Sequence, residues 1–265
     1  MNPSQTESMP AIEDLSERLR FSIVVPFYNE SSNAAPLIRE IRSLTATWSD
    51  PYEIILIDDG SADFTAAAIR DEIVTWSEAR LLQLFENYGQ AAALYIGMQA
   101  ARGEYVILLD GDSQNDPRDI PRLLNALDGA DLVVGLRRDR QDSVARLIMS
   151  QLGNALRSRL LGDGIKDSGC GLKAFRREVI AAFIPIRTLY SFMPALALSA
   201  GYKVTQLPVH HRPRKSGKSK YGIRVFAWRP VVDLLGVWWF CRRRCPNALP
   251  KTAKPAGKVA EPLDS

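Results

Sequence analysis

Short apolar runs alternate with longer segments of helical spacing along most of the chain. The apolar runs are rich in Ile, Val and Leu, which is typical of strands buried on both faces of a sheet. We expect strands at Phe21–Val25, Glu53–Ile57, Leu81–Phe85, Tyr105–Leu109 and Leu132–Val134. We expect helices between them at Ala34–Thr47, Phe64–Trp76, Gln90–Ala101 and Ile120–Leu127, with Asp63 and Asp119 as N-terminal caps. This alternation predicts an α/β fold with a doubly wound, mostly parallel sheet and flanking helices.

The pattern changes in the second half of the chain. A long helical stretch at Ser143–Leu161 is followed by a loop at Asp167–Gly171, helices at Phe175–Phe183 and around Phe192–Ala200, and a strand at Lys203–Val209. We therefore predict four regions. They are a polar leader at residues 1–20, an α/β domain at 21–211, a basic and aromatic segment at 212–245, and a disordered tail at 246–265.

Composition narrows the class of protein. The chain has 265 residues, of which 46% are hydrophobic and 24% charged, an ordinary balance for one large folded domain. The polar, acidic first twenty residues do not resemble a signal peptide, and no apolar run reaches the roughly 18 residues that span a bilayer. Three cysteines in a chain of this length do not form a disulfide framework. These features predict a cytoplasmic location.

Polar motifs follow the first two strands, at the edge where ligands bind in open α/β sheets. Pro26 lacks an N–H for the strand ladder, and it precedes Tyr28, Asn29 and Glu30, which are placed to bond a base or a ribose. In the second motif the carboxylates of Asp58 and Asp59 repel each other unless a donor or cation lies near, which favours ligand contact. Each motif alone is also compatible with a simple turn or a helix cap.

A third motif, Asp110-Gly111-Asp112-Ser113-Gln114, follows the very apolar run that ends at Leu109. The two carboxylates and the amide oxygen alternate along the chain and can converge on one hard cation such as Mg²⁺ or Mn²⁺. Such an ion stabilises a diphosphate as it leaves, without any proton transfer. An acidic turn is the alternative interpretation. The motif favours a metal site formed by Asp110, Asp112 and Gln114.

The three motifs, in this order, resemble the inverting family 2 glycosyltransferases of the GT-A fold, and within them the polyprenyl-phosphate branch, which is dolichol-phosphate mannosyltransferase-like. Asp110 to Pro117 resembles the branch's DADLQDP motif, with Gly for Ala, Ser for Leu and an extra Asn115. Further matches are to the N-x-G, VVGSR, D-x-x-x-G and HRPR…GxSKY segments. They lie here at Asn87–Gly89, Val133–Arg137, Asp167–Gly171 and His211–Tyr221. The resemblance spans Phe21 to Phe240.

The resemblance implies transfer of a sugar from a nucleotide diphosphate sugar to polyprenyl phosphate, with inversion at the anomeric carbon. It assigns donor binding to Pro26, Tyr28, Asn29, Glu30, Asp59, Asp110 and Asp112, and it makes residues 21–211 the catalytic domain. It assigns the acceptor phosphate to Arg137, Arg212, Ser219 and Lys220, because an approaching anion needs charge neutralisation. Asp112, Asp167 and Arg137 are the candidate catalytic residues. Asp167 is either a base or the group that orients one of these cations.

The basic and aromatic segment predicts a membrane surface as a partner. Trp228, Trp238 and Trp239 flank an apolar stretch between two basic clusters, and such residues favour lipid headgroups. We expect Val225–Phe240 to lie in the interface, on the inner face of the cytoplasmic membrane, as an amphipathic membrane-associating segment. The charge is confined to one segment, which argues against nucleic acid. Burial of the aromatics in the core is the alternative.

Other assignments stay open. Many members of the branch carry transmembrane helices, which leaves room for an integral-membrane partner or a homo-oligomer. The acceptor could instead be a glycan or another hydroxyl compound, or the chain could be a catalytically silent sugar-nucleotide-binding or membrane-scaffold protein. The intact Asp110, Asp112 and Gln114 argue against a silent protein.

Overall fold

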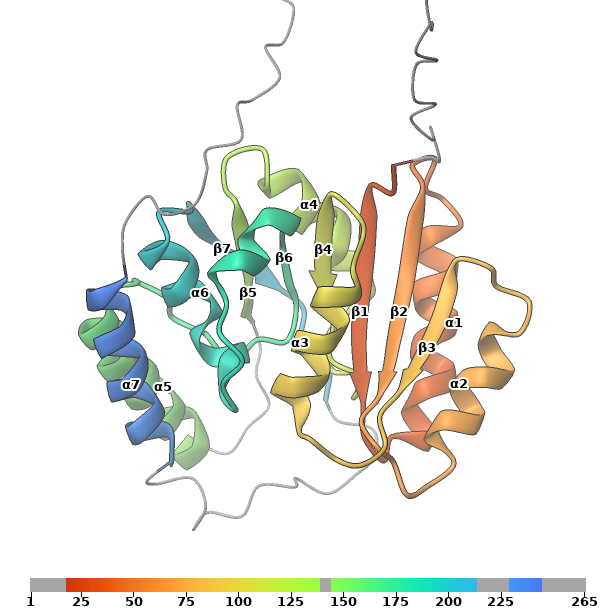
Figure 1. Ribbon diagram of the computed structural model, residues 1–265, viewed down its shortest axis with the longest axis horizontal. Coiled ribbons are helices and arrows are strands. Elements are labelled where there is room, and N and C mark those ends of the chain that lie inside the picture. Colours follow the sequence, from red (N-terminus) through yellow and green to blue (C-terminus); the bar gives the residue numbers. More distant parts are fainter. Residues whose placement is uncertain (1–17, 139–143, 214–228, 245–265) are drawn as a thin grey trace, which may run out of the picture.

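The computed structural model describes residues 18–138, 144–213 and 229–244, and the side chains of 144–151, 229 and 230 are not described. Its centre is a seven-stranded sheet in the order β3-β2-β1-β4-β6-β5-β7 (Figure 1). The strands are β1 (Phe21–Phe27), β2 (Tyr52–Asp58), β3 (Ala79–Gln83), β4 (Tyr105–Leu108), β5 (Leu132–Arg137), β6 (Lys173–Arg176) and β7 (Val204–Val209). All neighbours pair in parallel except β6, which runs antiparallel to both β4 and β5. The predicted doubly wound, mostly parallel sheet is confirmed.

Helices cover both faces of the sheet. The helices are α1 (Ser31–Thr45), α2 (Thr65–Ile73), α3 (Gln90–Ala100), α4 (Ile120–Ala126), α5 (Val144–Leu161), α6 (Leu189–Ser199) and α7 (Arg229–Arg243), with 3₁₀ turns η1 (Pro117–Asp119) and η2 (Arg177–Ala182). One core cluster joins the sheet to α1, α2 and α4, and the other joins it to α3, α6 and α7. Successive strand residues point to opposite faces, so Ile23 and Val25 enter the first cluster and Val24 enters the second.

The structure corrects the interpretation of Phe175–Phe183. The segment is not one helix: β6 takes residues up to Arg176, and only the 3₁₀ turn η2 follows. Phe175 pairs with Val106 of β4 and Leu132 of β5, and its fully buried ring packs against that of Phe183. The short strand has no clear period of its own, which is why its sequence did not distinguish it from a helix.

Two smaller predictions are also corrected. The third strand lies two residues earlier than expected and ends at Gln83, which leaves the Phe85 side chain fully exposed. Asp119 stands at the N-cap position of α4 but its carboxylate makes no cap hydrogen bond, and it accepts the backbone N–H of His210 at 2.7 Å instead. The N-cap of α2 is Phe64 and not Asp63, although Asp63 accepts the backbone N–H of Thr65 at 3.0 Å.

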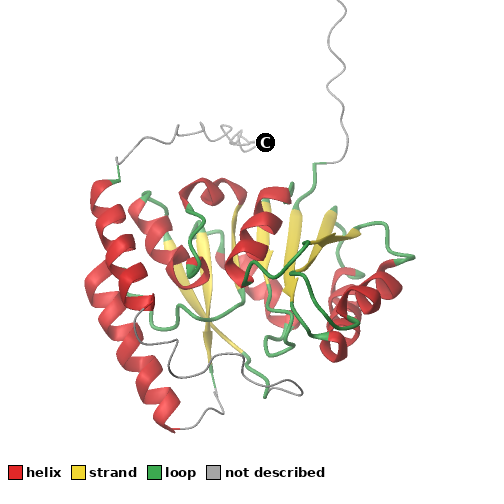
Figure 2. Ribbon diagram, turned by 60° about the horizontal axis from the view of Figure 1, so that its bottom comes forward, coloured by secondary structure: helices red, strands yellow, loops and turns green. Residues whose placement is uncertain are grey.

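The C-terminal helix α7 packs beside α5 and α6 at one end of the sheet (Figures 1 and 2). It buries Leu234 and Val237, and Arg244 just beyond it donates to the carbonyl of Ala182 at 2.9 Å. Its outer side exposes Val231, Val232, Leu235 and Trp239, while α5 exposes Leu152 and Leu156. Among the described residues, none of the helices combines the length and the apolar character needed to cross a membrane.

Candidate active site at the carboxyl edge of the sheet

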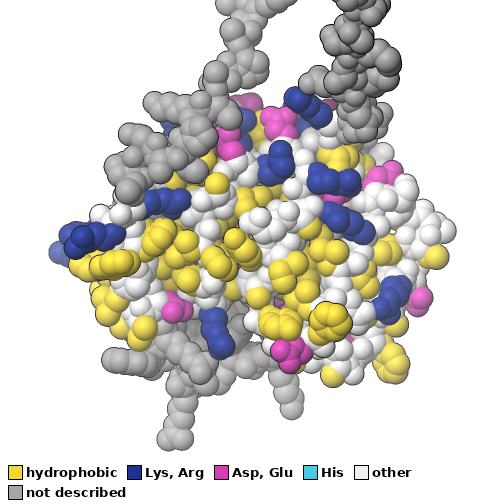
Figure 3. Space-filling model, viewed as in Figure 1, with side chains coloured by type: hydrophobic (Ala, Val, Ile, Leu, Met, Phe, Trp, Pro, Cys, Tyr) yellow, Lys and Arg dark blue, Asp and Glu magenta, His cyan; other side chains and the backbone are white. Residues whose placement is uncertain are grey.

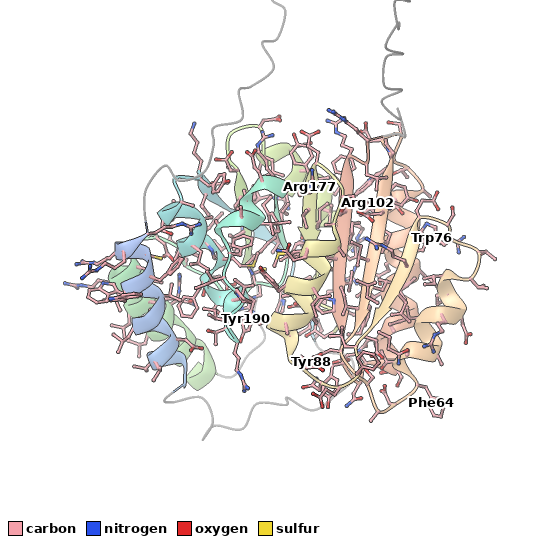
Figure 4. All side chains as sticks on the ribbon, viewed as in Figure 1. Phe64, Trp76, Tyr88, Arg102, Arg177 and Tyr190 are labelled. Carbon is pink, nitrogen blue, oxygen red and sulfur yellow. The ribbon has the colours of Figure 1, made fainter. Side chains whose placement is uncertain are left out.

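The loops that follow β1, β2, β4 and β5 meet at one edge of the sheet, the lower edge in Figure 1. Parallel strands end at the same edge, so the motifs at Asn29, Asp59, Asp110 and Arg137 are brought together although they are far apart in the sequence. Tyr88 projects from this edge in Figure 4, below α3. The predicted donor-side and acceptor-side residues with described side chains therefore share one edge.

The loops after β1 and β2 are locked to each other through Asn29. Its backbone N–H donates to the Ser61 hydroxyl at 2.9 Å, and its side-chain oxygen accepts the N–H of Ala62 at 2.9 Å. Asn29 has a φ of 51°, in the left-handed region that Asn tolerates better than most residues. The neighbouring Glu30 is buried, and its backbone N–H donates to the Thr65 hydroxyl at 2.8 Å. These two predicted donor residues thus shape the loops. Pro26 lies inside β1, where it pairs with Ile57, so the strand does not end there as expected.

Asp59 is held by the loop that precedes α3. Its carboxylate accepts the backbone N–H groups of Tyr88 and Gly89 and the side-chain amide of Asn87, each at 2.9 Å. Burial raises the pKa of Asp59, while the two backbone hydrogen bonds oppose that rise. Gly60 has a φ of +64°, and a Cβ there would lie 2.3 Å from the backbone of Glu86. Glycine is therefore required for this close approach.

Asp110 lies between the residues predicted for the donor and those predicted for the acceptor. The side-chain amide of Gln90, the first residue of α3, donates to its Oδ1 at 2.7 Å. A Cβ added at Gly171 would lie 1.9 Å from its Oδ2, so the loop before β6 passes directly against this carboxylate. Burial and the charge of Asp112 raise the pKa of Asp110 to about 6, against the opposing charges of Lys173 and Arg137.

The residues present fit a divalent cation in part. Asp110 and Asp112 repel each other strongly enough to raise a pKa, which is the electrostatic condition that a bound cation relieves. Asp112 Oδ1 accepts the N–H of Gln114 at 3.1 Å, and Ser113 between them has a φ of 60°, so the motif forms a tight turn. No group of three or more His, Cys, Asp or Glu residues that could hold a metal occurs in the described parts of the chain. A cation here would rely on the carboxylate pair with an amide, water or substrate oxygens.

Arg137 and Asp167, both predicted to serve the acceptor side, form a bidentate ion pair. Arg137, at the end of β5, donates from Nε and Nη2 to the two carboxylate oxygens of Asp167, each at 2.7 Å, and from its backbone N–H at 3.2 Å. Both side chains are largely buried, with exposed fractions of 17% and 6%. Burial alone would lower the pKa of Arg137, but the Asp167 carboxylate outweighs it and raises the pKa overall. Arg137 therefore stays charged, and Asp167 fixes its orientation.

Arg212 ties the end of β7 to the loop of the third motif. Its guanidinium forms ion pairs with Glu40 at 2.7 Å and Asp116 at 2.9 Å, and its backbone N–H donates to the carbonyl of Gln114 at 2.8 Å. The basic segment thus begins beside the candidate metal motif. Two other predicted acceptor residues, Ser219 and Lys220, lie outside the described residues, as does Trp228.

Three side chains of this edge were not assigned a role from the sequence. Asn87 and Gln90 hold Asp59 and Asp110, and their only signal was the match of Asn87–Gly89 to the N-x-G segment, which Gln90 directly follows. Lys173 is 1% exposed at the start of β6. The signal for it was a single charge inside the apolar run from Leu172 to Phe175.

Comparison with known proteins places the chain in a family. The family model described as "Glycosyl transferase family 2" matches residues 22–183, which is more than half of the chain. The chain belongs to glycosyltransferase family 2. This glycosyltransferase is 35% identical to the dodecaprenyl-phosphate galacturonate synthase of Rhizobium johnstonii, over 89% of this chain and 71% of that protein.

A second group of relatives is described as undecaprenyl-phosphate 4-deoxy-4-formamido-L-arabinose transferases. The one from Aeromonas hydrophila is 41% identical over 76% of this chain and 63% of its own length, so the chain spans less than two thirds of that relative. Among solved structures, glucosyl-3-phosphoglycerate synthase from Mycobacterium tuberculosis, in complex with Mn²⁺, UDP-glucose and phosphoglyceric acid, matches with a TM-score of 0.63. It is 23% identical over 83% of this chain and 80% of that one, a likeness that shows the GT-A fold alone.

Proposed function

We propose that this family 2 glycosyltransferase moves a sugar from a nucleotide diphosphate sugar to polyprenyl phosphate, with inversion at the anomeric carbon. The observation that carries the proposal is the buried Arg137–Asp167 pair, which stands beside Asp110 at the sheet edge. It supplies a fixed cation to an anionic acceptor next to the residues that bind the donor. The similarity to proteins named as dodecaprenyl- and undecaprenyl-phosphate transferases supports this acceptor class.

On the donor side, we assign the nucleotide to Pro26, Tyr28, Asn29, Glu30 and Asp59. Asp59 is already engaged by the loop at residues 87–89, so this contact orders the wall of the nucleotide site before the donor arrives. The hydrogen bond between Asn29 and Ser61 fixes the adjoining loops that follow β1 and β2. Preorganised walls lower the entropic cost of binding.

Asp110, Asp112 and Gln114 are the residues we propose to hold a divalent cation, Mg²⁺ or Mn²⁺. When bound, the cation supplies Lewis-acid stabilisation of the diphosphate that leaves. Gln90 orients Asp110 by donating to Oδ1, and Gly171 blocks movement of Oδ2 from the other side. The protein thus presents the Asp110 carboxylate in one orientation.

On the acceptor side, a phosphate monoester has a second pKa of about 6, so its attacking oxygen is largely ionised near neutral pH. A strong base is then less necessary than a cation that lets two anions approach. Arg137 is that cation, and Asp167, whose two oxygens both accept from it, orients it. We assign Arg212, Ser219 and Lys220 to the same phosphate, with Arg212 exchanging part of its contact with Glu40 and Asp116 for the ligand.

The exposed apolar sides of α5 and α7 are the surface that we propose to contact the membrane, from the cytoplasmic face. Figure 3 shows apolar and basic side chains next to each other at the end of the molecule where α7 lies. Arg242 stacks on the ring of Trp238 at 4.7 Å, so charge and aromatic surface are presented together. On its other side α5 reaches the acceptor loop, where the Ser168 hydroxyl donates to Asn154 at 3.0 Å. A lipid-linked acceptor would approach along this end.

The proposed function is tested with radiolabelled UDP- and GDP-sugars, each incubated with polyprenyl phosphate or with a soluble glycan, in the presence of Mg²⁺ or Mn²⁺. We expect organic-extractable label with polyprenyl phosphate from one of the donors, and none with the Asp112→Asn variant. Label found only in the glycan would assign a hydroxyl acceptor. No transfer to either acceptor, together with intact donor binding, would assign a silent binding protein.

A further inference from the structure

Lys173 is a buried charge at the start of β6, the strand that lies between β4 and β5. Its side chain is 1% exposed, and lysine is almost never fully buried unless its ammonium is paired. The residues that follow it in β6, Ala174 and Phe175, belong to the apolar core. An apolar residue at this position would avoid the cost of removing a charge from water. The position of Lys173 therefore needs a reason beyond packing.

The register of β6 places Lys173 between the two halves of the site. It pairs with Leu108 of β4, two residues before Asp110, and with Val134 of β5, three residues before Arg137. Because β6 runs antiparallel, the loop at 167–171 enters β6 at the same edge at which β4 and β5 end. Lys173 is thus the first residue of the one antiparallel strand among the described strands.

The ammonium of Lys173 donates to the carbonyl of Cys170, inside the loop at 167–171. Both ends of that loop touch the site. At one end Asp167 accepts from Arg137, and at the other end Gly171 lies against the Asp110 carboxylate. The Cys170 carbonyl stands between them. Burial lowers the pKa of Lys173, and the negative groups around it, Asp110 and Asp167 among them, oppose that effect.

We propose that Lys173 is a positioning residue, which holds the loop at 167–171 through the Cys170 carbonyl and thereby fixes the spacing between Asp110 and the Arg137–Asp167 pair. It acts on substrates only through these neighbours. The consequence for the reaction follows from geometry, because a shift of about 1 Å between donor and acceptor groups can cost on the order of 10²-fold in rate. This inference rests on the proposed sugar transfer to a phosphate acceptor.

The alternative is a buried lysine that serves only the fold. The variant Lys173→Met distinguishes this structural role from the positioning role, since methionine fills similar space without a charge or a hydrogen-bond donor. A purely structural lysine would leave the turnover of Lys173→Met unchanged, or reduce it in proportion to lost folding. A positioning lysine would leave folding and donor binding intact and lower kcat. Lys173→Gln, which can still donate to the Cys170 carbonyl, should recover part of the loss.

The experiment compares wild type, Lys173→Met, Lys173→Gln and the control Lys166→Met in full-length protein. Lys166 is an exposed lysine directly before that loop, and its backbone N–H donates to the Gln206 side chain, a bond that Lys166→Met retains, so this variant should match wild type. For Lys173→Met we expect an unchanged or higher Tm, a donor KM within about threefold of wild type, and a kcat lower by on the order of 10²-fold. The kcat of Lys173→Gln should fall between that of wild type and that of Lys173→Met.

Hydrogen exchange gives a readout that needs no substrate. Amides at residues 168–172 should exchange faster in Lys173→Met than in wild type, with the rest of the sheet unchanged. If wild type forms no lipid-linked sugar, the proposed function fails, and the exchange result still decides whether Lys173 holds the loop. If wild type is active, a kcat of Lys173→Met within twofold of wild type, or equal losses in the Met and Gln variants, overturns the inference. If Lys173→Met does not fold, the same measurements on Lys173→Gln decide it.

Discussion

Arg137 and Asp167 form a bidentate ion pair, in which Nε and Nη2 of the arginine each lie 2.7 Å from a different carboxylate oxygen. Both carboxylate oxygens accept from the guanidinium, and Oδ2 also accepts the backbone N–H of Arg137, which is why we assign Asp167 an orienting role. A general base needs a free oxygen within hydrogen-bond reach of the proton that it removes. The pair is therefore the place where the chemistry of the acceptor can be tested most directly.

We expect Arg137→Ala to lower transfer to polyprenyl phosphate by on the order of 10²-fold while leaving binding of the nucleotide sugar nearly unchanged. The variant removes the cation that we propose to face the acceptor, and it spares Asp59 and the loops that hold it. Calorimetry for the donor and a transfer assay for the acceptor measure the two effects. The neighbouring Arg138 is exposed, and Arg138→Ala is the matched control. Loss of donor binding in Arg137→Ala would mean that the two subsites are reversed.

The variant Asp112→Asn should abolish turnover without unfolding the protein, because it removes a proposed ligand at the surface of a tight turn. EDTA should inhibit the wild type, and added Mg²⁺ or Mn²⁺ should restore its activity. Asp128→Asn changes an exposed carboxylate elsewhere and serves as the control. Full activity of the wild type in chelator would contradict the metal assignment.

Asp110 predicts a pH dependence of stability in the metal-free protein. Its pKa is raised to about 6, above the ordinary value of 3.8, so the fold favours the protonated carboxyl. The stabilisation of the folded state by the protonated Asp110 carboxyl is therefore complete below pH 3.8. It is lost as the pH rises through about 6 and the carboxyl ionises. Asp110→Asn cannot ionise, so it should be more stable than wild type at pH 7.5 by about 1 to 3 kcal/mol, although inactive. Denaturant unfolding at several pH values measures this, and a difference that does not change with pH would contradict it.

Gly171→Ala should damage the site because its methyl group would lie 1.9 Å from Asp110 Oδ2. We expect a loss of activity of at least tenfold and destabilisation of about 1 to 3 kcal/mol, since either the loop or the carboxylate must move. Gly153 in α5 has no atom within 4 Å of its added Cβ. Gly153→Ala is therefore the control, and it should be neutral or slightly stabilising. If Gly171→Ala and Gly153→Ala had equal activity and equal stability, the loop at 167–171 would have room for the added methyl group.

Membrane contact through α5 and α7 predicts the outcome of flotation with anionic liposomes. Trp239→Gln, and truncation before Phe226, should reduce co-flotation, and the truncated protein should lose more activity on long-chain than on short acceptors. Val74→Gln changes an equally apolar exposed residue beyond α2 and should have no effect. The electrostatic part of the membrane-binding free energy, about 1 kcal/mol per basic residue near the lipid surface, should weaken in salt. The part contributed by the aromatic side chains should persist. If full-length and truncated proteins stay in solution alike, the helices do not bind lipid.

The sequence predicted the parallel part of the sheet because Ile54–Ile57 and similar runs are apolar on both faces and are followed by polar turns. It also predicted which residues reach the sheet edge, since parallel strands all end at the same edge and the motifs directly follow those ends. It did not predict β6, whose pairing with β4 and β5 depends on contacts distant in the sequence. The partners of Asp59, Arg137 and Arg212 were equally inaccessible, because a motif gives a residue's place along the chain and not the side chains that other loops bring to it.

The position of β6 also bears on how the chain acquires its fold during synthesis. β1 to β4 can pair as soon as residues 21–108 are made, but β5 has no place beside β4 until residues 173–176 are inserted between them. Until then β4 presents an open edge, the kind of exposed strand that invites pairing with other chains. A nascent chain that ends before β6 would carry both Arg137 and Asp167, but it would lack the strand into which the loop at 167–171 leads. The same short strand that joins the two halves of the site is therefore expected to complete the folding of the sheet.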